Sequence, residues 1–164
     1  MAKSAGKSPA TTDISDDHGD AVRVLDAIFA DFGGVEAFHG PVKTLKCFED
    51  NAKVRQAVES PGNGQVLVVD GGGSERCALF GGNLAELAEK NGWAGVVVYG
   101  FIRDWAEIET FKIGMKALGT HPKKSVKADG GTYDVPVTFA GHTIKPGDWL
   151  YADRDGVVVA DKEL

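Results

Sequence analysis

The 164-residue chain contains few of the residues that normally hold a disulfide-bonded or zinc-bound protein together. It has two cysteines, Cys47 and Cys77, and neither lies in a CxxC pair or beside a histidine. Two cysteines are too few for a disulfide framework, and their surroundings do not predict a zinc site. The four histidines also lack the spacing of metal ligands. We therefore expect two reduced, partly buried thiols in an intracellular protein.

The sequence also lacks a membrane-spanning or signal segment. No apolar run approaches the roughly 18 residues needed to cross a bilayer. The first residues are polar and small and contain no apolar core typical of a signal peptide. We expect a cytoplasmic protein with a disordered tail over residues 1–14 and one folded domain over residues 15–164.

A surplus of basic residues is absent as well. The formal net charge is −6, with 18 Lys and Arg against 24 Asp and Glu. Such a chain has no general electrostatic attraction to nucleic acid or to anionic membranes, so neither is an expected direct partner. A local basic patch is compatible with this balance. Hydrophobic residues make up 43% of the chain, which is sufficient for a normal core in one domain of this size.

Hydrophobic periodicity predicts strands that alternate with helices, followed by a β-rich end. Strand-like patterns are expected around residues 40–48, 65–69, 76–80 and 94–99. Helices are expected from Asp16 or Asp17 to Asp31, from Asp50 to about residue 61, after residue 81, and after Asp104. From about residue 114 the pattern predicts antiparallel β-structure, including a hairpin around 135–144 and strands at 149–151 and 156–160. One α/β domain is the simplest interpretation.

The first segment that could carry chemistry is Gly81-Gly82-Asn83-Leu84, at the expected start of a helix. Two glycines allow a ligand to approach the backbone closely, and the unpaired N–H groups of a first helical turn bind anions such as carboxylates. The alternative is a glycine-rich turn with Asn83 as N-cap and Glu86 three residues later, which forms a capping box.

The second segment is Arg103-Asp104, which follows an expected buried strand and begins a helix. In α/β folds ligands bind at this position. Arginine can clamp a carboxylate or stabilise an enolate oxygen, and aspartate can ligate a hard divalent cation. The alternative is again a capping box, with Asp104 as N-cap, Glu107 at the third helical position and a solvated Arg103.

A third segment, Asp70-Gly71-Gly72-Gly73-Ser74, looks like a phosphate-binding loop. It lacks the lysine that follows the glycines in a P-loop, so a tight turn is the better interpretation.

Several motifs in the same order resemble the ribonuclease E activity regulator A family, over roughly residues 13 to 160. They are KCFEDN at 46–51, VLVVDGGGS at 66–74, LAELA at 84–88, VYG at 98–100 with Arg103, and LYAD at 150–153 with Asp155-Gly156.

This resemblance implies a swivelling-type β/β/α domain with a mixed sheet and flanking helices, assembled as a homotrimer or a dimer of trimers. It implies a lyase that depends on a divalent cation, Mg²⁺ or Mn²⁺. Such enzymes cleave 4-hydroxy-4-methyl-2-oxoglutarate and related 4-hydroxy-2-oxo acids to pyruvate. They also decarboxylate oxaloacetate, since both reactions pass through a pyruvate enolate. The alternative within the family is a non-catalytic regulator that inhibits a ribonuclease E-type enzyme or an RNA helicase through protein contacts.

The aldolases of this family carry an aspartate, twenty residues, and then Arg-Asp. Here Arg103-Asp104 matches, and Gly82 stands where the aldolases have the aspartate. This chain resembles a plant-like variant with glycine at that position and an acidic residue three after the aspartate of Arg-Asp, which is Glu107. The resemblance implies that Arg103 and Asp104 are catalytic, that 81–84 and Arg103 bind the substrate, and that Asp104, with Glu107 through water, holds the metal.

Overall fold

A computed structural model describes residues 7–164 of the chain. Its main element is a nine-stranded mixed sheet in the order β1-β11-β10-β3-β4-β5-β6-β2, with β7 paired to β3. The strands are β1 (Val22–Val24), β2 (Ala30–Asp31), β3 (Phe38–Lys46), β4 (Val66–Asp70), β5 (Gly95–Ile102), β6 (Gly114–Thr120), β7 (Thr132–Tyr133), β8 (Val137–Phe139), β9 (His142–Ile144), β10 (Trp149–Asp153) and β11 (Gly156–Ala160). β8 and β9 form a separate hairpin. The helices are α1 (Thr11–His18), η1 (Gly19–Ala21), α2 (Ala52–Glu59), α3 (Gly82–Lys90) and α4 (Trp105–Ile108).

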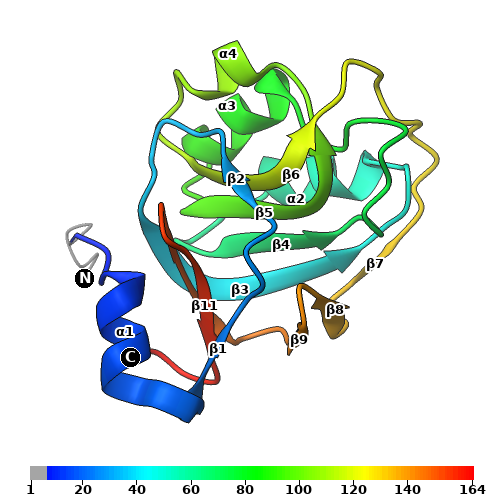
Figure 1. The fold of residues 1–164 in the computed structure, drawn as a ribbon. Helices are drawn as coiled ribbons and strands as arrows, with labels where there is room; N and C mark the ends of the chain where they lie inside the picture. Colours follow the sequence, from blue (N-terminus) through cyan, green and yellow to red (C-terminus); the bar gives the residue numbers. More distant parts are fainter. Residues whose placement is uncertain (1–6) are drawn as a thin grey trace.

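The four strands β3, β4, β5 and β6 are parallel neighbours in chain order, joined by α2, α3 and α4. All three helices lie on the same face of the sheet (Figure 1). Parallel strands covered on both faces are usually continuous apolar runs, and β4 is buried at all five positions. This arrangement brings the carboxyl ends of the four strands to one edge of the sheet.

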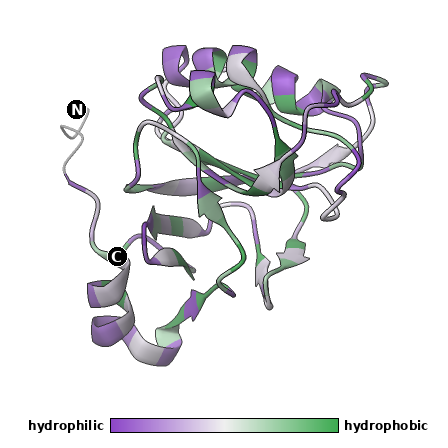
Figure 2. Cartoon of the chain, turned by 45° about the horizontal axis from the view of Figure 1, so that its top comes forward, coloured by the Kyte–Doolittle hydropathy of each residue, from purple (hydrophilic) through white to green (hydrophobic). Residues whose placement is uncertain are grey.

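The sheet separates two hydrophobic cores. Leu67 and Val69 face the helices, whereas Val66 and Val68 face the β8–β9 hairpin and the antiparallel strands. Apolar residues accordingly concentrate along the strands, and the helices carry hydrophilic segments (Figure 2). The prediction of a mixed sheet with flanking helices is confirmed.

The amino-terminal predictions were wrong in two respects. Helix α1 begins at Thr11, inside the tail expected to be disordered, and ends at His18 rather than Asp31. Thr11 is held by Asp153, whose carboxylate accepts hydrogen bonds from its N–H at 2.9 Å and its hydroxyl at 2.7 Å. Gly19 has a φ of 52°, which ends the helix. Residues 1–6 of the predicted tail lie outside the described residues.

The strand predicted over residues 76–80 is also absent from the structure. Ala78 forms only isolated bridges, to Phe101 and to Lys124. The segment at residues 70–74 is a tight turn, as expected, with positive φ at Gly72 and Gly73. The predicted strands near 40–48, 65–69, 94–99, 149–151 and 156–160 are confirmed to within a few residues. No helix in residues 7–164 is long and apolar enough to span a bilayer.

Candidate functional site

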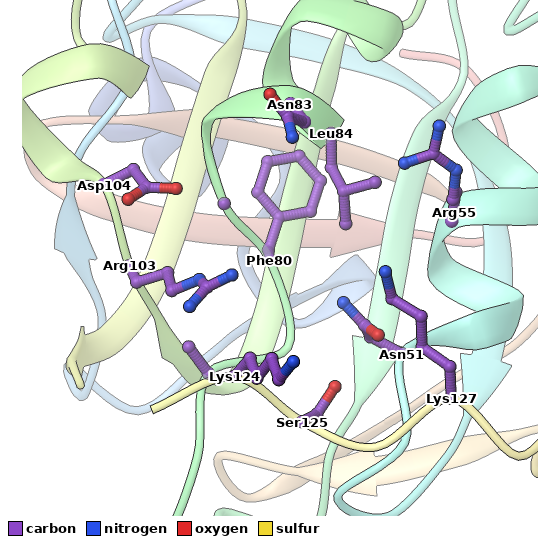
Figure 3. A pocket seen from close by; sticks show the side chains of 12 residues that line it. Asn51, Arg55, Phe80, Asn83, Leu84, Arg103, Asp104, Lys124, Ser125 and Lys127 are labelled. Carbon is purple, nitrogen blue, oxygen red and sulfur yellow. The ribbon is translucent and has the colours of Figure 1, made fainter. Parts of the chain in front are cut away.

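A small pocket of about 80 Å³ lies at the carboxyl edge of the parallel strands (Figure 3). It brings together residues that follow β3, β4, β5 and β6 in the chain. Its lining residues are Asn51, Arg55, Ala78, Phe80, Gly81, Asn83, Leu84, Arg103, Asp104, Lys124, Ser125 and Lys127. Both segments that the sequence singled out, 81–84 and 103–104, therefore contribute to one pocket.

The amino end of α3 faces this pocket and has no cap from its own side chains. Gly81 occupies the N-cap position with an extended backbone, and no side-chain capping bond is formed there. The capping box predicted as an alternative for Asn83 is therefore wrong, because Asn83 is already inside the helix. The N–H groups of Asn83 and Leu84 belong to the first turn and have no carbonyl partner within a helix. They remain available to an anion.

Asp104 caps α3 instead of its own helix. Its Oδ2 accepts a hydrogen bond from the N–H of Gly82 at 2.9 Å, and it makes no side-chain cap on α4. The capping box predicted as an alternative for Asp104 and Glu107 is therefore wrong as well. Asp104 also has a left-handed backbone, with φ of 63° and ψ of 40°. Such conformations are uncommon outside glycine, although aspartate tolerates them, and they concentrate at functional sites.

Glu107 lies against the second glycine of this turn. A Cβ built on Gly82 would lie 2.2 Å from Glu107 Oε2, and one on Gly81 would lie 2.8 Å from Asp104 Oδ2. Any side chain at position 82 would thus enter the space that the Glu107 carboxylate fills. This arrangement is the one expected if the Glu107 carboxylate replaces that of the aspartate found in the aldolases.

Arg103 extends from the end of β5 into the pocket (Figure 3). Its Nη1 makes one long hydrogen bond, of 3.4 Å, to the carbonyl of Pro122. Its aliphatic part lies near Gly81, since a Cβ there would be 3.4 Å from Arg103 Cγ. The guanidinium forms no ion pair with a described residue, so its remaining donors can bind a carboxylate or an enolate oxygen.

The donor groups beside the α3 turn fit a hard divalent cation. No three described His, Cys, Asp or Glu side chains are grouped to hold a metal. Asp104 and Glu107, however, offer two carboxylates at one turn, and neither forms an ion pair with a described residue. Mg²⁺ commonly binds through one or two carboxylates and keeps several waters. The thiols do not contribute, since both are buried and burial raises the pKa of Cys47 to about 12.

Five polar pocket residues were not predicted from the sequence. They are Asn51, Arg55, Lys124, Ser125 and Lys127. Three of these come from the segment after β6, where the sequence reads HPKKSVK at 121–127. A cluster of lysines in an acidic chain was the available signal, but its position beside α3 depends on the parallel order of the sheet.

The buried carboxylate of Asp50 holds this basic segment in place. It accepts backbone hydrogen bonds from Ala52 at 3.0 Å, Ala128 at 3.0 Å and Gly130 at 2.9 Å. Burial raises the pKa of Asp50, but the three N–H donors more than offset it, and the pKa lies below its ordinary value. The first turn of α2 and the segment carrying Lys127 are therefore tied to one charged group.

The sequence as a whole matches a known family. Residues 11–159 match the family described as "RraA-like: Aldolase/RraA". The chain belongs to the Aldolase/RraA family. A protein of Alkalilimnicola ehrlichii, named as a candidate 4-hydroxy-4-methyl-2-oxoglutarate aldolase, is 63% identical over 154 residues, covering 94% of this chain and 96% of that protein. A Burkholderia mallei protein with the same name is 56% identical, over 94% of this chain and 97% of its own length.

Two solved structures share the fold at higher than 45% identity but carry other descriptions. One, from Geobacillus kaustophilus, is described as an S-adenosylmethionine:2-dimethylmenaquinone methyltransferase. It has a TM-score of 0.93 and 47% identity over 95% of this chain and 97% of its own. The other, the RNA-processing inhibitor RraA from Thermus, has a TM-score of 0.92 and 48% identity over 95% and 94%. Because these names differ, the function of an Aldolase/RraA member must be argued from its site.

Proposed function

We propose that this protein is a divalent-metal-dependent lyase that cleaves 4-hydroxy-4-methyl-2-oxoglutarate, and related 4-hydroxy-2-oxo acids, to pyruvate. The observation that supports this most strongly is that three functional side chains lie together at the start of α3. Arg103, Asp104 and Glu107 all lie against the Gly81–Gly82 turn, which leads into the first turn of α3, where Asn83 and Leu84 line the pocket. The names of the relatives at 63% and 56% identity point to the same reaction.

The reaction is a retro-aldol cleavage. The 4-hydroxyl loses its proton, the C3–C4 bond breaks, and its electron pair moves to the 2-oxo group to give the enolate of pyruvate. C4, its methyl group and the far carboxylate leave as a second pyruvate. Protonation of the enolate at C3 then completes the first pyruvate. Oxaloacetate gives the same enolate with loss of carbon dioxide, so we expect decarboxylation as a side activity.

Residues in the pocket, with Glu107 beside it, supply the binding and the charge stabilisation. The N–H groups at the start of α3 bind the carboxylate next to the 2-oxo group. The Arg103 guanidinium stabilises the negative charge that develops on the enolate oxygen. Asp104 and Glu107 would hold Mg²⁺ or Mn²⁺, which acts as a Lewis acid on the 2-oxo oxygen when bound. Asp104 also fixes the helix start through Gly82, so one side chain positions both the cation and the backbone donors.

A coupled assay for pyruvate tests this proposal. Purified protein is incubated with 4-hydroxy-4-methyl-2-oxoglutarate, or with oxaloacetate, in the presence of Mg²⁺ or Mn²⁺ and then with excess chelator. We expect pyruvate release that stops with the chelator and returns when metal is added back. Turnover that is insensitive to chelation, or none with either cation, contradicts the proposal.

The 48% identity to the Thermus RNA-processing inhibitor motivates a second candidate function. This protein would bind a ribonuclease E-type enzyme or an RNA helicase and inhibit it. The net charge of −6 favours protein contacts over direct RNA binding. Adding the protein to a purified ribonuclease E and measuring cleavage of a short RNA tests this role, and an unchanged rate at micromolar protein argues against it.

A further inference from the structure

The glycine-rich turn after β4 borders a second pocket, which the proposed reaction does not use. This pocket has a volume of about 580 Å³, and small-molecule sites commonly enclose about 300–1,000 Å³. It shares no lining residue with the pocket at the start of α3. Its lining residues are Lys46, Cys47, Phe48, Asp50, Asp70, Gly72, Tyr99, Gly130, Gly131 and Thr138.

Three polar side chains lie side by side in the second pocket, at the carboxyl ends of β3, β4 and β5. In the register of these parallel strands Lys46 is opposite Asp70, and Asp70 is opposite Tyr99. The residue before each of them belongs to the core beneath the helices. Because successive side chains of a strand alternate between the two faces, these three lie on the opposite face, where the β8–β9 hairpin packs (Figure 1).

The Asp70 carboxylate keeps one oxygen available to a ligand. Asp70 is only 7% exposed, and its Oδ1 accepts the N–H of Gly72 at 2.9 Å. Its Oδ2 accepts no hydrogen bond from any residue of 7–164, yet it is not sealed in the interior, so it opens into the pocket. A largely buried carboxylate is costly unless donors surround it. The ammonium group of a ligand would supply such donors at this oxygen.

Lys46 provides the opposite charge beside it. The residue is exposed and forms no ion pair within the described part of the chain. Asp70 is its neighbour across β3 and β4, but the two side chains do not pair with each other. A ligand that carries a carboxylate and an ammonium on adjacent atoms can therefore bind both side chains at once.

Two aromatic rings lie against the glycine-rich turn and supply apolar surface to the pocket. A Cβ built on Gly72 would lie 2.9 Å from Phe48 Cδ2, and one on Gly73 would lie 3.1 Å from Tyr99 Cε2. Glycine at both positions thus allows the two rings to approach the turn. The Tyr99 ring also stacks on Phe139, with a centroid distance of 5.0 Å. Aromatic surface of this kind favours an aromatic side chain on the ligand.

We propose that the second pocket binds an aromatic α-amino acid. The ammonium of the ligand binds Asp70 Oδ2, its carboxylate binds the Lys46 ammonium, and its ring packs against Phe48 and Tyr99. This site is separate from the pocket at the start of α3 and does not depend on the lyase reaction.

Titration calorimetry without added metal tests the proposal with L-phenylalanine and two analogues that each lack one charged group. 3-Phenylpropanoate lacks the ammonium, and 2-phenylethylamine lacks the carboxylate. We expect L-phenylalanine to bind about 10-fold or more tightly than either analogue, because each missing group removes a hydrogen bond between charged partners. An analogue that binds as tightly as L-phenylalanine, or no binding of L-phenylalanine at millimolar concentration, would overturn the proposal.

Matched variants assign the binding to this pocket. Asp70→Asn and Lys46→Gln should each weaken L-phenylalanine binding about 10- to 100-fold, and Lys46→Gln changes an exposed side chain that the fold does not need. Lys43→Gln removes the same charge from β3 outside the pocket, and Arg103→Gln removes a cation of the other pocket. Both should retain the wild-type affinity. Unchanged affinity in Lys46→Gln, or lost affinity in Arg103→Gln, contradicts the proposal, and neither result depends on the pyruvate assay.

Discussion

At the residue scale, the role of Asp104 can be separated from its structural bond to Gly82. Asparagine keeps an oxygen that can accept the Gly82 N–H and tolerates the left-handed backbone at least as well. It offers no negative charge to a cation, however. We expect Asp104→Asn to lower kcat by on the order of 10²-fold or more, while the melting temperature hardly changes. A fully active, fully metal-dependent variant would show that Asp104 serves only as a helix cap.

The effects on activity of substitutions at Glu107 and Gly82 should be coupled. Glu107→Ala should lower the activity, because it removes the second carboxylate beside the turn. Gly82→Asp alone should also lower it, because the new side chain meets the Glu107 carboxylate. The double variant Gly82→Asp/Glu107→Ala should recover activity relative to Glu107→Ala, since a carboxylate again occupies that space. Steady-state kinetics of all four proteins tests this coupling, and additive losses in the double variant would contradict it.

The sequence predicted this part of the site from residue types and spacing. Arg103, Asp104 and the two glycines were identified because glycine at a helix start and Arg-Asp after a strand have specific chemical uses. The direction of the Asp104 side chain was not predictable, since a capping box uses the same residues. Only the packing of α3 beside α4 decides which helix the carboxylate caps.

At the scale of elements, the Asp50 carboxylate joins the first turn of α2 to the basic segment after β6. Asp50→Asn replaces one of the two carboxylate oxygens by an NH₂ group, so at least one of the three N–H donors loses its partner. We expect a loss of about 1–3 kcal/mol in the free energy of unfolding. Urea denaturation measures this loss. The control is Asp129→Asn, which changes an exposed carboxylate in the same segment and should cost much less stability.

The same carboxylate makes stability depend on pH. The pKa of Asp50 in the folded protein lies below its unfolded value of about 3.9. The stability that its carboxylate contributes is therefore fully present at pH values above that unfolded pKa. It is lost as the pH falls through the folded pKa. Asp153 follows the same rule: burial raises its pKa, but the bonds from Thr11 and the N–H of Asp155 lower it overall. Melting temperatures should therefore fall steeply below about pH 4, and less steeply in Asp50→Asn. An unchanged acid profile in that variant would argue against this role for Asp50.

Elements with strong apolar patterns were predictable, and those held by tertiary contacts were not. β4 is an uninterrupted apolar run, and its prediction was confirmed. Helix α1 buries only Thr11 and Ile14, and it depends on a carboxylate 142 residues away in the chain. No local pattern indicates such a partner. Apolar residues at helical spacing after Gly19 suggested a longer helix, but in the structure they belong to β1 and the segments around β2.

At the scale of the whole molecule, several large apolar side chains remain on the surface. Phe48 is 57% exposed, Trp105 50% and Val126 63%. We propose that the chain assembles as a homotrimer or a dimer of trimers, which would cover such residues. Light scattering at micromolar concentration should give three or six times the chain mass of 17.3 kDa. A monomer at that concentration would contradict the proposal.

Hydrogen exchange at the methyl group of pyruvate tests most directly whether the pocket at the start of α3 stabilises a pyruvate enolate. Pyruvate is incubated with the protein and Mg²⁺ in D₂O, and its methyl signal is followed by proton NMR. Formation of the enolate and its protonation at C3 replace hydrogen by deuterium without any net reaction. We expect a loss of signal that requires both the protein and the metal and is strongly slowed in Asp104→Asn. A methyl signal that persists with wild-type protein and either Mg²⁺ or Mn²⁺, at the rate seen without protein, would contradict it.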